Sequence, residues 1–230
     1  MRSDQIMTRG YAIGLLIVDA FAGFQEERLK ATKIQIEREL REKYGQFTRD
    51  ALKELEGLRP YVAYYKAFGY TYHVLLQLES VAREKAIPGA LPPVSAMFMA
   101  ELKNGILTAG HDLDAVRLPI RSMVSNGAEG YTALGRKDVT CVSGDHFIAD
   151  QEGILSSMLR GPDQRTAITG QTRRFLYTAY APDGVSEEAL RKHLMDIESL
   201  LRPDAHDSPC YIKVIRAEAA ETPLLDAGEI

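Results

Sequence analysis

The chain has 230 residues, of which 45% are hydrophobic and 26% charged, a composition typical of a globular protein with one sizeable core. Its 28 basic and 32 acidic residues give a net charge of −4, so the chain lacks the basic excess of a dedicated nucleic-acid binder. No apolar run approaches the about 18 residues of a membrane span, and no signal peptide is recognisable. We therefore expect a cytoplasmic protein without membrane contact.

The first half of the chain predicts one strand followed by helices. The apolar segment Tyr11–Val18 predicts the strand, and an amphipathic pattern from about Glu26 to Tyr44 predicts the first helix. Further helices are expected over Leu52–Leu58, after Pro60, after Thr71 as N-cap, and over Val94–Leu102. The helix after Pro60 carries an aromatic stripe that would suit base stacking, but its helical spacing favours a packed core face: Tyr61, Tyr64, Tyr65 and Phe68.

From Ile106 onward, short β-branched or aromatic segments alternate with turns and predict several strands. Ser186 is a suitable N-cap for a last long helix, Glu187–Leu201, and a strand over Tyr211–Ala217 follows. The order strand, helices, strands, helix and strand predicts an α+β fold. We expect a single domain over residues 1–230, with a core over 11–217 and a loose tail at 218–230.

Motifs for common cofactors and nucleophiles are missing from the sequence. It lacks a phosphate-binding loop, a dinucleotide-binding glycine pattern and a G-x-S-x-G elbow, so we predict no cofactor. Cys141 and Cys210 lack a C-x-x-C spacing, and we interpret them as structural.

The loop Gly161–Thr166, between two predicted strands, is the strongest candidate for a site. Arg165 and Thr166 place a guanidinium and a hydroxyl side by side, which suits binding of a carboxylate, a phosphate or an amide. Alternatively, the arginine braces its own loop by bonding backbone carbonyls. The functional interpretation places Arg165 in a pocket shared with the turn at His111.

Two His–Asp pairs border predicted strands, His111–Asp112 and Asp145–His146. Neither a helical H-E-x-x-H pattern nor paired cysteines and histidines accompany them, so we predict no metal site. Aspartate in such turns more often bonds its own backbone two residues on. The remaining histidines are interpreted as packed, exposed or isolated: His73, His193 and His206.

Two segments resemble a known family. Pro92-Pro-Val with Gly110-His-Asp-Leu-Asp114, and Asp150-x-x-Gly-Ile-Leu with Arg165-Thr-x-Ile-Thr-x-x-Thr172, resemble the B3/B4 domain of the bacterial phenylalanyl-tRNA synthetase β subunit and its stand-alone relatives. The resemblance covers roughly residues 15–201. It implies an α+β fold with a pocket for an aminoacyl group. In the synthetase that domain hydrolyses tyrosine wrongly esterified to the phenylalanine tRNA.

The family's editing residues align with different residue types in this chain. Its editing histidine falls at Ala109 and its editing glutamate at Thr178. We expect His111 to act as the base and Arg165 to bind a carbonyl or phosphate. The expected substrate-binding residues are Asn104, Asp112, Asp145, His146, Thr166, Tyr177 and Thr178.

These observations favour a stand-alone module that binds an aminoacyl group, and that either binds aminoacyl-tRNA or edits it in trans by ester hydrolysis. Such a module would need a basic surface, which Arg136, Arg173 and Arg174 could supply. One alternative is an enzyme acting on a small amino-acid-derived metabolite without RNA, which the acidic net charge favours. Another is a noncatalytic interaction module.

Overall fold

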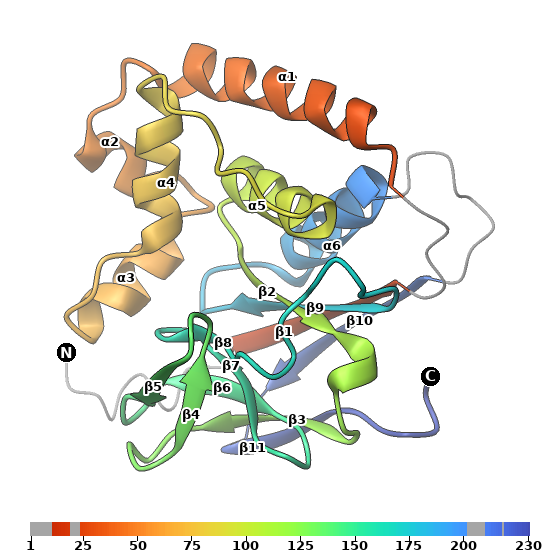
Figure 1. Cartoon of the computed structure of the whole chain (residues 1–230). Coiled ribbons are helices and arrows are strands. Elements are labelled where there is room, and N and C mark those ends of the chain that lie inside the picture. The colour runs from red at the N-terminus through yellow and green to blue at the C-terminus, as the bar shows by residue number, and fades with distance from the viewer. Residues whose placement is uncertain (1–10, 19–23, 202–209, 218) are drawn as a thin grey trace.

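The computed structural model describes residues 11–18, 24–201, 210–217 and 219–230, and it confirms an α+β fold (Figure 1). Helices α5 (Pro92–Asn104) and α6 (Glu187–Leu201) lie on one face of a four-stranded sheet. A five-stranded sheet lies on the other face of that sheet. His206 lies outside the described residues.

The first sheet is antiparallel, in the order β10 (Cys210–Ala217), β1 (Tyr11–Val18), β9 (Phe175–Ala181) and β2 (Leu107–Asp112). Every residue of β1 and β9 is buried, because helices cover one face of these strands and the second sheet covers the other. Gly14 permits this packing: an added Cβ would lie 2.8 Å from Leu194 Cδ1 of α6.

The second sheet runs in the order β11 (Glu221–Leu225), β3 (Ile120–Val124), β6 (His146–Ala149), β7 (Ile154–Ser157) and β8 (Gly161–Pro162). A separate hairpin pairs β4 (Gly130–Ala133) with β5 (Lys137–Thr140). Side-chain hydrogen bonds join the two sheets. The Tyr180 and Ser156 hydroxyls lie 2.7 Å apart, and the Tyr11 hydroxyl bonds that of Ser122.

The helical layer consists of α5, α6 and four helices from the first half of the chain: α1 (Glu26–Tyr44), α2 (Arg49–Lys53), α3 (Arg59–Ala67) and α4 (His73–Ala82). The sequence predicts the bounds of α1 and α6 correctly, and the Ser186 hydroxyl caps α6 by accepting from Ala189 N at 3.1 Å. Thr71 was the wrong N-cap, because α4 begins at His73 with Tyr72 before it.

The tyrosines of α3 form a packed face, as their spacing predicts. Tyr61, Tyr64 and Tyr65 are buried, and their hydroxyls donate to Tyr180 O, Asp145 Oδ1 and Met158 O, respectively. These bonds attach α3 to both sheets, so the rings are not available as a stacking platform.

The expectation of a loose tail was wrong for Glu221–Leu225, because these residues form β11 against β3. Leu224 and Leu225 are each only 1% exposed. The pairing joins segments about a hundred residues apart, so the short local sequence, which contains Pro223, does not reveal it.

This arrangement predicts that Leu224 holds the C-terminal strand in place. Leu224→Ala should lower the free energy of unfolding by about 2–5 kcal/mol, because it removes a fully buried side chain and leaves a cavity. Ile230→Ala is the control, since Ile230 is 44% exposed, and should change stability by less than about 0.5 kcal/mol. Urea unfolding measures both variants. Equal stabilities would contradict the packing of β11.

Candidate functional site

An apolar cavity of about 270 Å³ lies at the outer edge of β2, where α5 and the second sheet meet. Its wall contains four groups of residues: Val94, Met97 and Phe98 of α5; Leu107, Ala109 and Gly110 of β2; Gly161 and Pro162 of β8; and Ala167 with Ile168. The loop predicted to bear function therefore contributes to a cavity, through the residues on either side of Arg165 and Thr166.

Glu101 of α5 is the carboxyl group in this wall. The residue is 2% exposed, and one carboxyl oxygen accepts from Thr108 N at 2.8 Å. Burial raises the pKa of Glu101 to about 8, so the carboxyl is mainly neutral at pH 7. A neutral carboxyl can donate as well as accept a hydrogen bond.

The hydroxyls in the wall are held by other parts of the protein. Thr108 Oγ1 lies 2.6 Å from His193 Nε2, and Ser157 Oγ donates to Asp145 Oδ2 at 2.6 Å. The Tyr180 hydroxyl donates to Ser156 O at 2.8 Å. These groups shape the cavity, and the remaining polar side chains in its wall are Glu101 and His73.

Gly110 lies in the cavity wall on β2, next to His111, which is bridged to Ala167. Thr108 N donates to Glu101 and Asp112 N donates to Thr166 O, so alternate residues of β2 direct their backbone outward, and Gly110 lies between them. An added Cβ at Gly110 would lie 2.9 Å from Ile168 Cδ1 and 3.4 Å from Met97 Sδ. The absence of a side chain lets the cavity walls approach this peptide.

His111 lies on β2, but it is completely buried and is not part of the cavity wall. Its Nδ1 lies 2.8 Å from Thr166 Oγ1, and its Nε2 has no partner among the described residues. Burial, together with the nearby charge of Arg165, lowers the pKa of His111 to about 3. The ring is a neutral core group, not a base that reaches a ligand.

Arg165 braces its loop, which is the alternative that the sequence left open. Its guanidinium donates to Ala115 O and Asp150 Oδ1, each at 2.8 Å, and lies 3.1 Å from Glu152 Oε2. Neither Arg165 nor His111 lines the cavity at β2, so that cavity is not the pocket expected between them.

Thr166 and Asp112 are also structural. The Thr166 hydroxyl bonds Asp163, a buried residue, and Thr166 O accepts from Asp112 N at 2.7 Å. The Asp112 carboxylate accepts from Asp114 N at 3.1 Å, the backbone bond expected of such a turn, and from the Thr172 hydroxyl at 2.6 Å. Together these bonds attach the loop to the end of β2.

Asp145 and His146 belong to a different cluster, between α3 and the second sheet. Asp145 accepts from Tyr64, from Ser157 and from Leu159 N at 2.6–3.2 Å, while burial raises its pKa to about 6. The centroid of the His146 ring lies 3.6 Å from that of the Tyr11 ring, and burial lowers the pKa of His146 to about 4. Neither residue lines the cavity, although Ser157 connects Asp145 to it.

The other expected substrate-binding residues do not line this cavity, and Asn104 lines another one, of about 270 Å³, between the ends of α1 and α5 and helix α4. Asn104 Nδ2 donates to Asp196 at 3.0 Å, and the Tyr177 hydroxyl donates to Pro93 O at 3.2 Å. Thr178 is buried directly opposite Ala109 in the β2–β9 pairing, and its hydroxyl has no partner among the described residues. The two positions that align with the family's editing residues are thus neighbours, one of which lines the cavity.

Sequence reasoning missed Glu101, although a signal was present. The predicted inward stripe of this helix includes Val94 and Met97, and Glu101 lies seven and four residues beyond them, on the same face. A carboxyl within an apolar helical stripe indicates a buried polar group that needs an explanation.

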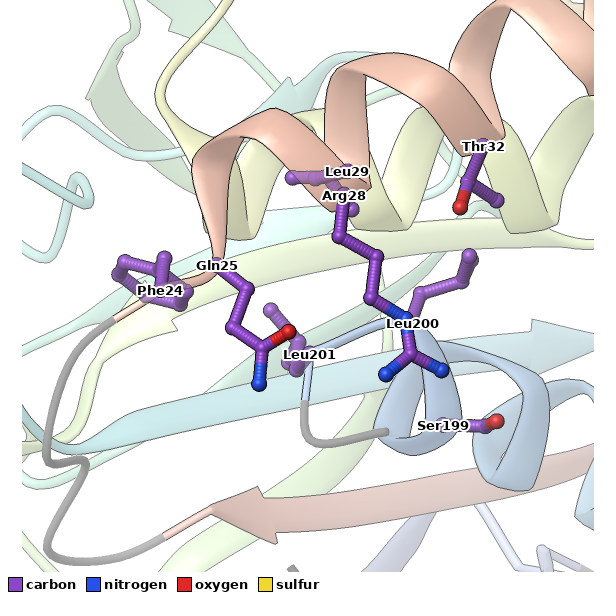
Figure 2. Close-up of a pocket in the computed structure, with 8 residues that line it drawn as sticks. All are labelled: Phe24, Gln25, Arg28, Leu29, Thr32, Ser199, Leu200 and Leu201. Carbon is purple, nitrogen blue, oxygen red and sulfur yellow. The ribbon is translucent and has the colours of Figure 1, made fainter. Parts of the chain in front are cut away.

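A smaller cavity, of about 180 Å³, lies between the start of α1 and the end of α6. Figure 2 shows Arg28 extending from α1 toward Ser199 and Leu200. Two of its lining residues, Phe24 and Leu201, adjoin in sequence the residues 19–23 and 202–209, whose structure is not described.

Among the described residues, no group of three or more histidine, cysteine, aspartate or glutamate side chains is arranged to hold a metal ion. Likewise, none of the described helices is long and apolar enough to cross a membrane.

Comparison with known proteins gives a structural match only. No family model matches the chain, and no curated protein matches its sequence. Over 54% of its length the structure is similar to an N-terminal fragment of the phenylalanyl-tRNA synthetase β subunit from Pyrococcus horikoshii, with a TM-score of 0.41 and 12% identity. The match covers 45% of that fragment.

The contacts of Arg165 predict a structural role. Arg165→Ala should lower the free energy of unfolding by about 1–3 kcal/mol, because it leaves the buried Asp150 carboxylate without its cation. Arg173→Ala is the matched control, since Arg173 donates to the nearby carbonyls Gly170 O and Thr172 O. Chemical unfolding distinguishes the two variants. An unchanged stability for Arg165→Ala would refute the brace.

The buried histidines predict a loss of stability in acid. The pKa of His146 is about 4 in the folded protein, below the usual 6.5, so between these values the unfolded chain binds more protons. Its contribution is complete above pH 6.5 and should fall by about 1 kcal/mol per pH unit as the pH drops toward 4. His146→Phe keeps the aromatic contact with Tyr11 and should flatten this slope. Unfolding measured at several pH values tests it, and parallel curves would contradict the assignment.

Proposed function

We propose that the protein is a binding module for an aminoacyl group, presented as an amino-acid ester or amide or at the end of an aminoacyl-tRNA. The observation that carries the proposal is the apolar cavity at the edge of β2 with a single carboxyl in its wall. Drug-sized ligands occupy pockets of about 300–1,000 Å³. A cavity of about 270 Å³ suits one amino-acid side chain and its backbone atoms.

The residues of the cavity wall suit different parts of such a ligand. An apolar side chain would pack against Val94, Met97 and Phe98, where its burial contributes about 25 cal/mol per Å². The ligand carbonyl would lie at the edge of β2, beside Gly110. The resemblance in the 110–114 and 165–172 segments supports the same class of ligand.

The proposal is one of binding rather than hydrolysis. Ester hydrolysis requires a positioned water and preorganised donors at the developing oxyanion. His111 and Arg165, the residues expected to supply this chemistry, are committed elsewhere in the fold. An enzyme acting on an amino-acid-derived metabolite is the second candidate, favoured by the net charge of −4.

Calorimetric titration with the amides of phenylalanine, tyrosine and leucine tests the binding function. Ala109→Leu would fill part of the cavity and should weaken binding by at least about tenfold, or 1.4 kcal/mol. Ala189→Leu places the same side chain on the exposed face of α6 and should bind as the wild type does. Equal affinity of the two variants, or no binding by the wild type at millimolar ligand, would reject the proposal.

A second arm of the experiment separates the two sources of the aminoacyl group. Phenylalanyl-tRNA and tyrosyl-tRNA are incubated with the protein, and both complex formation and release of the amino acid are measured. Binding of the amides without binding of either tRNA would favour the metabolite alternative. Release of the amino acid would add hydrolysis to the function.

A further inference from the structure

We propose that Glu101 recognises a primary amine, so that the cavity selects apolar molecules that carry an ammonium group and lack a carboxylate. The inference rests on the proposed function for the cavity itself and adds the chemistry that determines its specificity. It separates amino-acid esters, amides and simple amines from free amino acids.

The geometry leaves one oxygen of Glu101 for a ligand. The side chain lines the cavity at 2% exposure, and one carboxyl oxygen is held by Thr108 N at 2.8 Å. The carboxyl has no further hydrogen bond or ion pair within the described part of the chain. Asp145 differs, because three donors occupy its carboxylate.

The surroundings supply no positive charge. Among the described residues, no lysine or arginine lines the cavity. The titratable groups around Glu101 are Tyr61, Tyr65 and Tyr72, His73 in the wall, and His193 behind Thr108. Burial raises the pKa of the three phenols and lowers that of both histidines, so all five groups are neutral at pH 7.

This electrostatic setting discriminates between ligand classes. A carboxylate or phosphate in the cavity would lie beside Glu101 without a cation to balance it, and burial of an unpaired charge is strongly unfavourable. An ammonium group would pair with the carboxylate through a charge-assisted hydrogen bond. An amino-acid ester or amide has the ammonium and no carboxylate, whereas a free amino acid carries both.

Binding would be coupled to proton release. The neutral carboxyl of the empty cavity loses its proton to solvent and becomes a carboxylate as the alkylammonium ion enters. The complex then contains the ion pair, and up to one proton appears in the buffer for each ligand bound at pH 7. A ligand without a charge would release none.

The experiment uses four probes with the same aromatic body: phenethylamine, phenylalaninamide, phenylalanine and 2-phenylethanol. Their binding is measured by calorimetry at pH 7 in phosphate and in Tris, whose ionisation enthalpies differ. We expect the amine and the amide to bind at least tenfold more tightly than phenylalanine, with proton release. Glu101→Gln keeps an acceptor for Thr108 N and should lose at least tenfold for the amine, with 2-phenylethanol unchanged.

The outcomes separate this inference from the proposed function. Equal binding of phenethylamine and 2-phenylethanol by the wild type would overturn the role of Glu101 while leaving the cavity as a binding site. Binding of none of the four probes would overturn both proposals. The comparison of ligands on the wild type decides the matter even if Glu101→Gln fails to fold.

Discussion

Strand β2 ends the buried sheet, and its outer edge, which is bridged only at His111 to Ala167 within the described residues, imposes the constraint on which the site depends. Every second residue of β2 directs its N–H and C=O to the outer edge, where an unpaired buried group would cost about 1–3 kcal/mol. Thr108 N is paired by a side chain of α5, and Asp112 N by a carbonyl of the 163–174 loop. Gly110 lies between these two residues and forms part of the cavity wall.

The interior around this edge is arranged to avoid charge. Burial lowers the pKa values of His111 and His193 to about 3, so both rings are neutral. Burial raises the pKa of Asp145 to about 6 and that of Glu101 to about 8. The two carboxyls differ in their partners: the three donors of Asp145 offset part of its burial, whereas Glu101 has one. The number of donors thus distinguishes the structural carboxyl of Asp145 from that of Glu101, which we propose is available to a ligand.

The sequence predicts well those helices whose ends are determined by nearby residues. The bounds of Glu26–Tyr44 and Glu187–Leu201 follow from helical periodicity and from local start and stop signals, and both agree with the structure. Strand β11 escaped prediction because its formation depends on β3, which lies far away in the chain. The site residues escaped for the same reason. Which side of a strand meets a cavity depends on strand register and on the helix that packs there, and Glu101 becomes a site residue only once α5 lies beside β2.

The loop Gly161–Thr166 shows how a motif can mark a site without performing its chemistry. Arg165 and Thr166, its most polar members, attach the loop to Asp150 and to the end of β2. That attachment holds Gly161 and Pro162, the loop residues without polar side chains, in the cavity wall. A resemblance in the sequence of such a loop therefore indicates that a pocket is present, because the loop forms part of the pocket wall. The specificity of the pocket depends on the elements that face the loop, which are α5 and the outer edge of β2.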